Sequence, residues 1–358
     1  MNNNPDILTN VFGYDENEVE YERVTSNLRG YDLDYGIEVI FNYWRKKGFP
    51  HYQVREDEKH THMRKLQKFD VDTIFKDNQI IQTMHCLRLA WTYFPHWVNV
   101  RCGNAPRTPM ETFMDDEKLR AVIKKCWRWC STQFAGEEGI DKNKFRENRF
   151  RQSLKIYTGT HAVSNFRPTA AKFIYEKFGG DVIWDMSCGW GGRLLGFLAS
   201  SRKKYIGTEP SSKTFEGLKK IRKDFFYLTK TVELHKLGSE EFEPDKNSLD
   251  LCFTSPPYFD TEKYSDEDTQ SYKKFPTKEE WVNGFLRKTI ENCYRGLKDG
   301  KYMLMNIANT PRYKFIEQET QRIAKELGFV QSDTLQLTLS SVMGAGYKYE
   351  PIFVFKKN

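Results

Sequence analysis

The sequence has no long hydrophobic run, and this absence argues against one class of protein. No stretch approaches the roughly 18–20 uninterrupted apolar residues that a membrane-spanning helix requires. The opening MNNNPDILTN also lacks the basic and apolar regions of a signal peptide. We therefore expect no membrane partner and a cytoplasmic location.

Cysteine is scarce and odd in number, which argues against a disulfide framework. The chain has seven cysteines among 358 residues, scattered over its length. Such usage is typical of a protein kept in a reducing compartment. Cys126 and Cys130 form an isolated CxxxC without a second pair nearby, so we predict two thiols on a helix and no metal site.

Hydrophobic residues are also few, at 39%, whereas charged residues reach 29% and aromatic residues 15%. The 26 Phe, 19 Tyr and 8 Trp nevertheless supply enough apolar area to exclude disorder over most of the chain. A length of 358 residues exceeds what one core usually serves, so we expect more than one domain.

Charge is distributed unevenly along the chain. Residues 1–37 carry eight acidic residues against two basic ones, and we interpret them as an acidic arm. Residues 118–177 carry fourteen basic residues against five acidic ones, a pattern that favours a polyanion partner over solvated helix faces. The candidate nucleic-acid contacts, which cluster around two phenylalanines, are Arg146, Arg149, Arg151 and Lys155.

Periodicity divides the remainder into two regions. Residues 38–160 are predicted to be mostly helical, with helices at 35–47, 74–93 and 115–134. Residues 161–358 alternate between strands and helices, which is typical of a doubly wound, mainly parallel α/β sheet. The predicted strands lie near 182–184, 205–208, 231–234, 249–254, 302–307, 333–340 and 350–356, the last two as an antiparallel edge.

A turn rich in glycine, Asp185–Gly192, joins a predicted strand to a helix. Glu209 ends the next strand, where a carboxylate can accept hydrogen bonds from ribose hydroxyls. This spacing fits nicotinamide dinucleotides as well as S-adenosylmethionine. The turn is not GxGxxG, and Asp185 at the strand end can face a cationic group, which favours S-adenosylmethionine. The alternative for Asp185 is a helix N-cap.

The tetrapeptide Ser255-Pro256-Pro257-Tyr258 follows a predicted buried strand. Two prolines make the segment rigid at the edge where α/β sheets bind ligands. The Ser255 oxygen and the Pro256 carbonyl can then orient one exocyclic amino group, and Tyr258 offers a face on which a base can stack. An oriented amine can attack a sulfonium methyl group directly, without a covalent enzyme intermediate. An ordinary Pro-Pro turn is the alternative.

These segments resemble the amino-group DNA methyltransferases, which methylate N6 of adenine or N4 of cytosine. The family's acidic glycine turn is similar to 185–191, its ribose-binding acid to Glu209, and its [D/N/S]PPY motif to 255–258. Segment 165–169 together with Lys172, and segment 238–240, are similar to its remaining cofactor contacts. The resemblance implies catalysis by Ser255, Pro256, Pro257 and Tyr258, and S-adenosylmethionine contacts by Asp185, Ser187, Gly189, Gly191, Glu209, Phe166, Arg167, Thr169 and Ser239.

The resemblance covers residues 161–358, a Rossmann-like methyltransferase domain, and implies a flipped base in double-stranded DNA as substrate, in a bacterial or phage-infected cell. Target recognition then falls to residues 38–160 by exclusion. No Pro-Cys pair occurs, which disfavours the cytosine C5 enzymes. Serine in the motif favours cytosine slightly. The alternatives are an RNA amino-methyltransferase of the guanine-N2 type and a catalytically silent nucleic-acid-binding protein.

Overall fold

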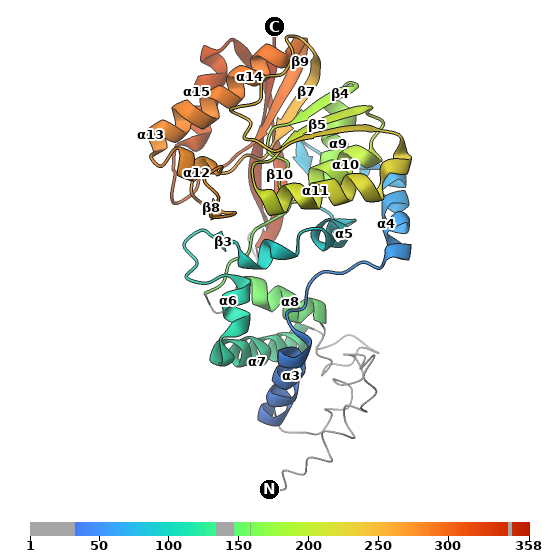
Figure 1. Ribbon diagram of the computed structural model, residues 1–358, viewed down its shortest axis with the longest axis vertical. Helices are drawn as coiled ribbons and strands as arrows, with labels where there is room; N and C mark the ends of the chain where they lie inside the picture. The colour runs from blue at the N-terminus through green and yellow to red at the C-terminus, as the bar shows by residue number, and fades with distance from the viewer. Residues whose placement is uncertain (1–32, 134–146, 158, 343–345) are drawn as a thin grey trace. The chain divides into compact units, whose positions relative to one another are not determined.

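The computed structural model describes residues 33–133, 147–157, 159–342 and 346–358 (Figure 1). The chain divides into two compact units. One comprises Met1–His51 and Asn104–Ala162, as far as it is described, and the other comprises Tyr52–Gly103 and Val163–Asn358. The boundary at residue 162 lies close to the expected one, but residues 52–103 belong to the unit that contains the sheet instead of the helical unit.

The regular elements described in the first unit are helices, as expected for residues 35–47 and 115–133. Trp44 of α3 packs against Phe150 of α8 with ring centroids 5.4 Å apart. Arg120 of α7 donates to Glu38 of α3 at 2.6 Å. Helix α7 contacts both α3 and α8, so apolar packing and this ion pair hold the helices together. The helices are α3 (Leu33–Lys47), α6 (Pro109–Met114), α7 (Asp116–Gln133) and α8 (Glu147–Ile156).

A nine-stranded sheet forms the centre of the second unit, in the order β1-β2-β10-β11-β9-β7-β4-β5-β6. Neighbouring strands from β9 to β6 are parallel, and β11 lies antiparallel between β9 and β10. The predicted doubly wound, mainly parallel α/β fold is therefore confirmed. The strands are β1 (Phe75–Lys76), β2 (Gln79–Ile80), β4 (Val182–Asp185), β5 (Lys204–Thr208), β6 (Thr231–His235), β7 (Leu249–Thr254), β9 (Leu297–Asn306), β10 (Phe329–Val342) and β11 (Gly346–Lys357).

The helix predicted over 74–93 is wrong for most of its length. Strands β1 and β2 form a hairpin there, and its turn residues Asp77 and Asn78 have φ angles of 51° and 58°. Asp and Asn tolerate this left-handed conformation better than most residues, so the dipeptide is a turn signal that the apolar spacing concealed. Because β2 pairs with β10, the C-terminal strand pair is antiparallel as predicted but does not form the edge of the sheet.

Residues 52–103 are tied to the sheet unit by side chains as well as by β2. Lys172 of α9 donates to the carbonyl oxygens of Leu66, Gln67 and Phe69, at 3.1, 2.7 and 2.8 Å. Lys172 thus caps the C-terminal end of α4, where carbonyl groups lack helical partners. The α-helices of this unit are α4 (Glu56–Lys68), α5 (Leu87–Thr92), α9 (Pro168–Phe178), α10 (Gly192–Ala199), α11 (Ser212–Asp224), α12 (Ser271–Lys274), α13 (Lys278–Trp281), α14 (Lys288–Gly296) and α15 (Ile316–Glu326).

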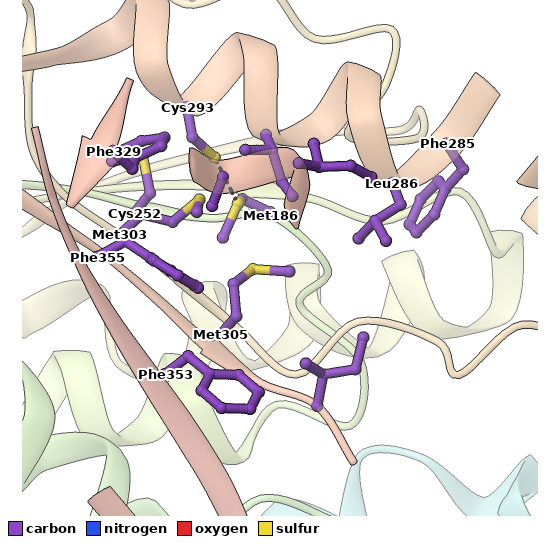
Figure 2. Packing of buried hydrophobic residues seen from close by; sticks show 14 of the residues in the cluster. Met186, Cys252, Phe285, Leu286, Cys293, Met303, Met305, Phe329, Phe353 and Phe355 are labelled. Atoms are coloured by element: carbon purple, nitrogen blue, oxygen red, sulfur yellow. Dashed lines mark hydrogen bonds between the residues drawn. The ribbon is translucent and has the colours of Figure 1, made fainter. Parts of the chain in front are cut away.

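The core beside the C-terminal half of the sheet is rich in sulfur and aromatic side chains (Figure 2). Cys252 of β7, Met303 of β9 and Phe355 of β11 are buried there with Cys293 of α14. Such large apolar side chains each contribute about 1.5–3 kcal/mol when fully buried. The strand ends that carry the site are therefore held by a packed core. No helix among the described residues has the length and apolar character needed to cross a bilayer.

Candidate active site

The turn between β4 and α10 requires glycine. Gly189 and Gly191 have φ angles of 56° and 73°, in the left-handed region. A Cβ atom at Gly191 would lie 2.5 Å from Cδ1 of Ile221 and 2.8 Å from the ring of Phe94. Gly191 is also the N-cap of α10, without a side-chain cap, so Asp185 is not the N-cap of this helix.

Asp185 is fully buried and bound by side chains of the protein itself. Nε of Arg193 donates to its two oxygens at 3.1 and 2.9 Å, and the Tyr205 hydroxyl donates at 2.7 Å. The Thr254 hydroxyl and the Ser187 backbone N–H add contacts at 3.3 Å each. The negative charge is therefore compensated within the core. Sequence reasoning missed Arg193 and Tyr205, because no motif marks them.

Glu209 directly follows β5 and lies beside the glycine turn. Its two oxygens accept the backbone N–H groups of Gly189, at 3.0 Å, and Ser211, at 2.9 Å. Burial raises the pKa of Glu209 to about 7, although both N–H groups oppose the rise. A carboxylate offers about four acceptor positions, so two remain for hydroxyl groups. The glycine turn and this carboxylate fit the ribose of the expected cofactor.

The Ser255–Tyr258 segment begins directly after β7, at the edge of the sheet that also carries Asp185 and Glu209. Ser255 is half-buried and Pro256 is buried. The Tyr258 hydroxyl donates to the carbonyl oxygen of Asn306, the last residue of β9, at 3.1 Å. Phe259 then turns the chain with a φ of 57° and is buried. The motif is thus fixed at both ends, by the strand and by a buried turn.

The other residues of the expected cofactor site are distributed around this edge. Phe166 stacks edge-to-face on Phe253 of β7, with ring centroids 5.3 Å apart. Arg167 donates to the Asn165 carbonyl at 2.8 Å, while its Nε is buried without a hydrogen-bond partner. Thr169 and Ser239 are buried, and their hydroxyls bond Thr83 at 2.9 Å and Thr289 at 2.7 Å respectively. The hydroxyl groups of Thr169 and Ser239 therefore form hydrogen bonds within the protein and contribute to its structure.

Three of the candidate nucleic-acid contacts, Arg149, Arg151 and Lys155, lie on α8 in the first unit. Arg151 is buried, and its guanidinium donates to the carbonyls of Pro50, at 2.5 Å, and His51, at 3.4 Å, and pairs with Glu147. The structure thus gives Arg151 an internal role, which the count of basic residues could not reveal. Arg149 and Lys155 are half-exposed. Arg146 lies outside the described residues.

The comparison with protein families concerns the C-terminal part of the chain. Residues 249–358 match the DNA methylase family of N6 and N4 enzymes. The matched segment begins at β7 and includes Ser255–Tyr258 and all later strands of the sheet. No curated protein matches the chain.

Several solved methyltransferase structures are similar to about half of the chain or more. An S-adenosylmethionine-dependent methyltransferase of Methanosarcina mazei is 14% identical over 51% of this chain and 94% of its own, with a TM-score of 0.37. A putative RNA methyltransferase of Pyrococcus horikoshii is 15% identical over 53% and 82%, with a TM-score of 0.35. Geranyl diphosphate methyltransferase with bound S-adenosylmethionine is 15% identical over 62% and 93%, with a TM-score of 0.40. Sequence identities and TM-scores this low support no conclusion about the substrate.

The family match and the geometry concern the same part of the fold. The matched residues supply the Ser255–Tyr258 segment and the strands β9 and β11 beside it. The match supports methyl transfer and S-adenosylmethionine as the methyl donor. Residues 249–358 of the chain are thus similar to the DNA methylase family of N6 and N4 amino-methyltransferases.

Proposed function

We propose that this protein transfers the methyl group of S-adenosylmethionine to an exocyclic amino group of a flipped base in double-stranded DNA, N4 of cytosine or N6 of adenine. The observation that supports this most is the rigid Ser255–Tyr258 segment at the end of β7. It lies on the same edge of the sheet as Glu209 and the glycine turn, so an amine acceptor and the cofactor would meet there.

Each residue of the segment has a distinct proposed role. The Ser255 oxygen and the Pro256 carbonyl accept the two N–H groups of the amine, which orients the nitrogen lone pair. The Tyr258 ring provides a stacking face, and Pro257 keeps the segment stiff. Glu209 accepts the ribose hydroxyls. The bound cofactor supplies an electrophilic methyl group on sulfur, and holding the amine in line with it accounts for much of the acceleration.

A base within a duplex cannot present its amino group to a buried strand end, so the proposed reaction includes base flipping. Extrusion of the base costs a few kcal/mol, and stacking on Tyr258 offsets part of that cost. The basic residues of the first unit, Arg146, Arg149 and Lys155, are proposed to contact phosphates, which would orient the duplex without reading its sequence.

The proposal is tested by mass spectrometry of nucleosides from cells that express the protein, with cells expressing Ser255→Ala as the control. N4-methylcytosine or N6-methyladenine that appears in DNA only with the unsubstituted protein supports the proposal and decides between the two bases. A methylated nucleoside found in RNA alone would replace DNA with RNA as the substrate. No new modified nucleoside in either would favour the catalytically silent nucleic-acid-binding protein.

The raised pKa of Glu209 leads us to expect that the affinity for the cofactor depends on pH. The ionised carboxylate accepts hydroxyl groups better than the neutral acid, and its pKa lies at about 7. Affinity should therefore rise with pH through 7 and be about tenfold weaker at pH 6 than at pH 8. Calorimetric titration with S-adenosylmethionine measures this. Glu209→Ala should weaken binding by about 1.5–3 kcal/mol and remove the pH dependence.

A matched control for Glu209 is Glu233→Gln, because Glu233 lies on the neighbouring strand β6 and pairs with Lys204 at 2.9 Å. Its affinity and pH dependence should equal those of the unsubstituted protein. If Glu209→Ala also left the affinity unchanged, Glu209 would have no part in cofactor binding.

Binding to DNA phosphates predicts a particular salt dependence. Charge reversal at Arg149 and Lys155 should weaken DNA binding and reduce the slope of log affinity against log salt by about one unit for each side chain that binds a phosphate. Fluorescence anisotropy over a series of salt concentrations measures the slope. Lys325→Glu on α15, an exposed position of the other unit, is the control. Equal slopes in all variants would show that α8 does not contact the DNA backbone.

A further inference from the structure

A hollow of about 530 Å³ lies beside the C-terminal half of α11, away from the residues discussed so far. Its buried lining is apolar and consists of Leu198 of α10, Phe225 and Val232 of β6. Most of its other lining side chains belong to α11 and are exposed, so the hollow is an open groove, which we call the α11 groove. Its volume is typical of ligand-binding sites.

The α11 groove lies at the edge of the sheet opposite the candidate active site. Its Lys230 directly precedes β6, whereas Glu209 directly follows β5, and β5 and β6 are parallel. Nζ of Lys230 donates to the carbonyl oxygens of Ser200, at 2.6 Å, and of Arg202, which lie between α10 and β5. The groove and Glu209 are therefore separated by the length of a five-residue strand, roughly 15 Å.

The α11 groove carries an excess of positive charge. Glu216 is its one acidic lining residue, and it pairs with Lys219 at 3.0 Å. The basic lining residues are Lys219, Lys220, Arg222, Lys223 and Lys230. Of these, Lys220, Arg222 and Lys223 are exposed and form no ion pair with any residue that the structure describes. Three cations on one wall of the groove are thus available to an anionic ligand.

An aromatic ring stands beside these cations in a fixed position. Phe226 is 79% exposed, yet its backbone belongs to the short 3-10 helix η3 (Phe226–Leu228), and its carbonyl accepts the Thr229 N–H at 3.2 Å. The Tyr227 ring packs at nearly a right angle to Phe226 and contacts His60 of α4, with centroids 6.5 and 5.0 Å away. The ring is therefore held with its apolar surface in water, where it forgoes the stabilisation that burial gives.

Exposed aromatic rings next to a positively charged groove are the features with which proteins bind single-stranded nucleic acid. A duplex keeps its bases stacked inside and offers no base face to Phe226. A membrane-binding surface presents a broad apolar face, whereas this groove is hollow and has one strongly exposed ring. Contacts with phosphates and a base face require no 2′-hydroxyl, so DNA suffices.

We propose that the α11 groove is a second nucleic-acid site, which binds single-stranded DNA. Lys220, Arg222 and Lys223 contact its phosphates, and one of its bases stacks on Phe226. The strand bound there is separate from the base that enters the candidate active site, so the groove adds a binding activity to the proposed methylation.

The site is tested by fluorescence anisotropy with a labelled oligothymidylate of about eight nucleotides. Phe226→Ala should weaken binding about tenfold, as for the loss of one stacked base. Lys220→Gln and Lys223→Gln should each weaken binding and reduce the slope of log affinity against log salt by about 0.7, the value for one phosphate of a single strand. The substituted side chains are exposed, so thermal unfolding and S-adenosylmethionine affinity should not change.

Matched controls lie elsewhere in the same unit. Phe315→Ala removes a phenylalanine that is 65% exposed, and Lys325→Gln removes an exposed lysine of α15. Both should bind the oligothymidylate as the unsubstituted protein does. Ultraviolet cross-linking followed by mass spectrometry of peptides should place the oligothymidylate on the peptide that contains Phe226.

Equal affinities in Phe226→Ala and in its control, or cross-links confined to other peptides, would overturn the site. Tenfold tighter binding of the ribo-oligonucleotide of the same length would overturn DNA as its ligand. Binding to vesicles of phosphatidylserine and phosphatidylcholine, without binding to the oligothymidylate, would make the α11 groove a membrane contact instead. Methylation of DNA in cells is measured separately, so the groove and the proposed methylation can each fail alone.

Discussion

Replacing Ser255 by alanine is expected to lower the rate of single-turnover methyl transfer by about 10²-fold or more. The reason is the geometry of the segment. Ser255 directly follows β7, and the rings of Pro256 and Pro257 restrict the backbone that follows it, so the segment cannot adopt another arrangement. Alanine would leave the amine with the Pro256 carbonyl alone. Rapid-quench measurements with labelled S-adenosylmethionine give the rate.

The same substitution should leave cofactor and DNA affinity close to normal, because the proposed role of Ser255 concerns the reacting amine. Ser201→Ala is a suitable control, since Ser201 is an exposed serine before β5. If Ser255→Ala and Tyr258→Ala both methylated DNA at the parental rate, the segment would not be the catalytic one. The proposal of a nucleic-acid-binding protein without activity would then be preferred.

The sequence predicts the parts of the site that local chemistry determines. Gly189 and Gly191 adopt backbone angles that few other residues tolerate, and Ser255–Tyr258 follows a strand whose residues are all buried. Both features depend on neighbours in the sequence. The spacing of Glu209 from the turn is informative for another reason, because a parallel strand and its crossover helix place successive strand ends at one edge.

The sequence does not predict the contacts that depend on distant pairing. Tyr258 and Asn306 are 48 residues apart in the sequence, and the pairing of β7 with β9 brings the Tyr258 hydroxyl within 3.1 Å of the Asn306 carbonyl oxygen. Nor does it show that Arg151 is buried, because an arginine in a basic segment looks the same whether it binds phosphates or backbone carbonyls. Such contacts follow from the register of the sheet and from helix packing.

The position of Asp185 is the most consequential difference between what the sequence predicts and what the structure shows. Its position at a strand end next to a glycine turn predicts that it faces a cationic group of the cofactor. The cation that it binds in the structure is Arg193, whose side chain is 5% exposed while that of Asp185 is 0% exposed. The carboxylate also raises the pKa of Arg193, against the effect of burial. This pair therefore joins β4 to α10, the two elements that flank the glycine turn.

Breaking this pair should be the most destabilising single change in the sheet unit. Arg193→Met removes the charge but keeps much of the side-chain volume, so Asp185 would remain buried with only neutral hydrogen-bond donors. The free energy of unfolding should fall by about 3–5 kcal/mol, as for other buried ion pairs in which one partner is removed. Denaturant unfolding measures this decrease, and Asp185→Asn should produce a decrease of similar size.

The double variant Asp185→Asn/Arg193→Met should be less destabilised than the sum of the two single variants, because it leaves no uncompensated charge in the core. Lys203→Ala is the matched control: its ion pair with Asp181 is 2.8 Å long, but the two side chains are 74% and 54% exposed. We expect its stability to change by less than about 1 kcal/mol. Equal, small effects in Arg193→Met and Lys203→Ala would show that Arg193 contributes no more than a surface charge, and Asp185 would again be available to the cofactor.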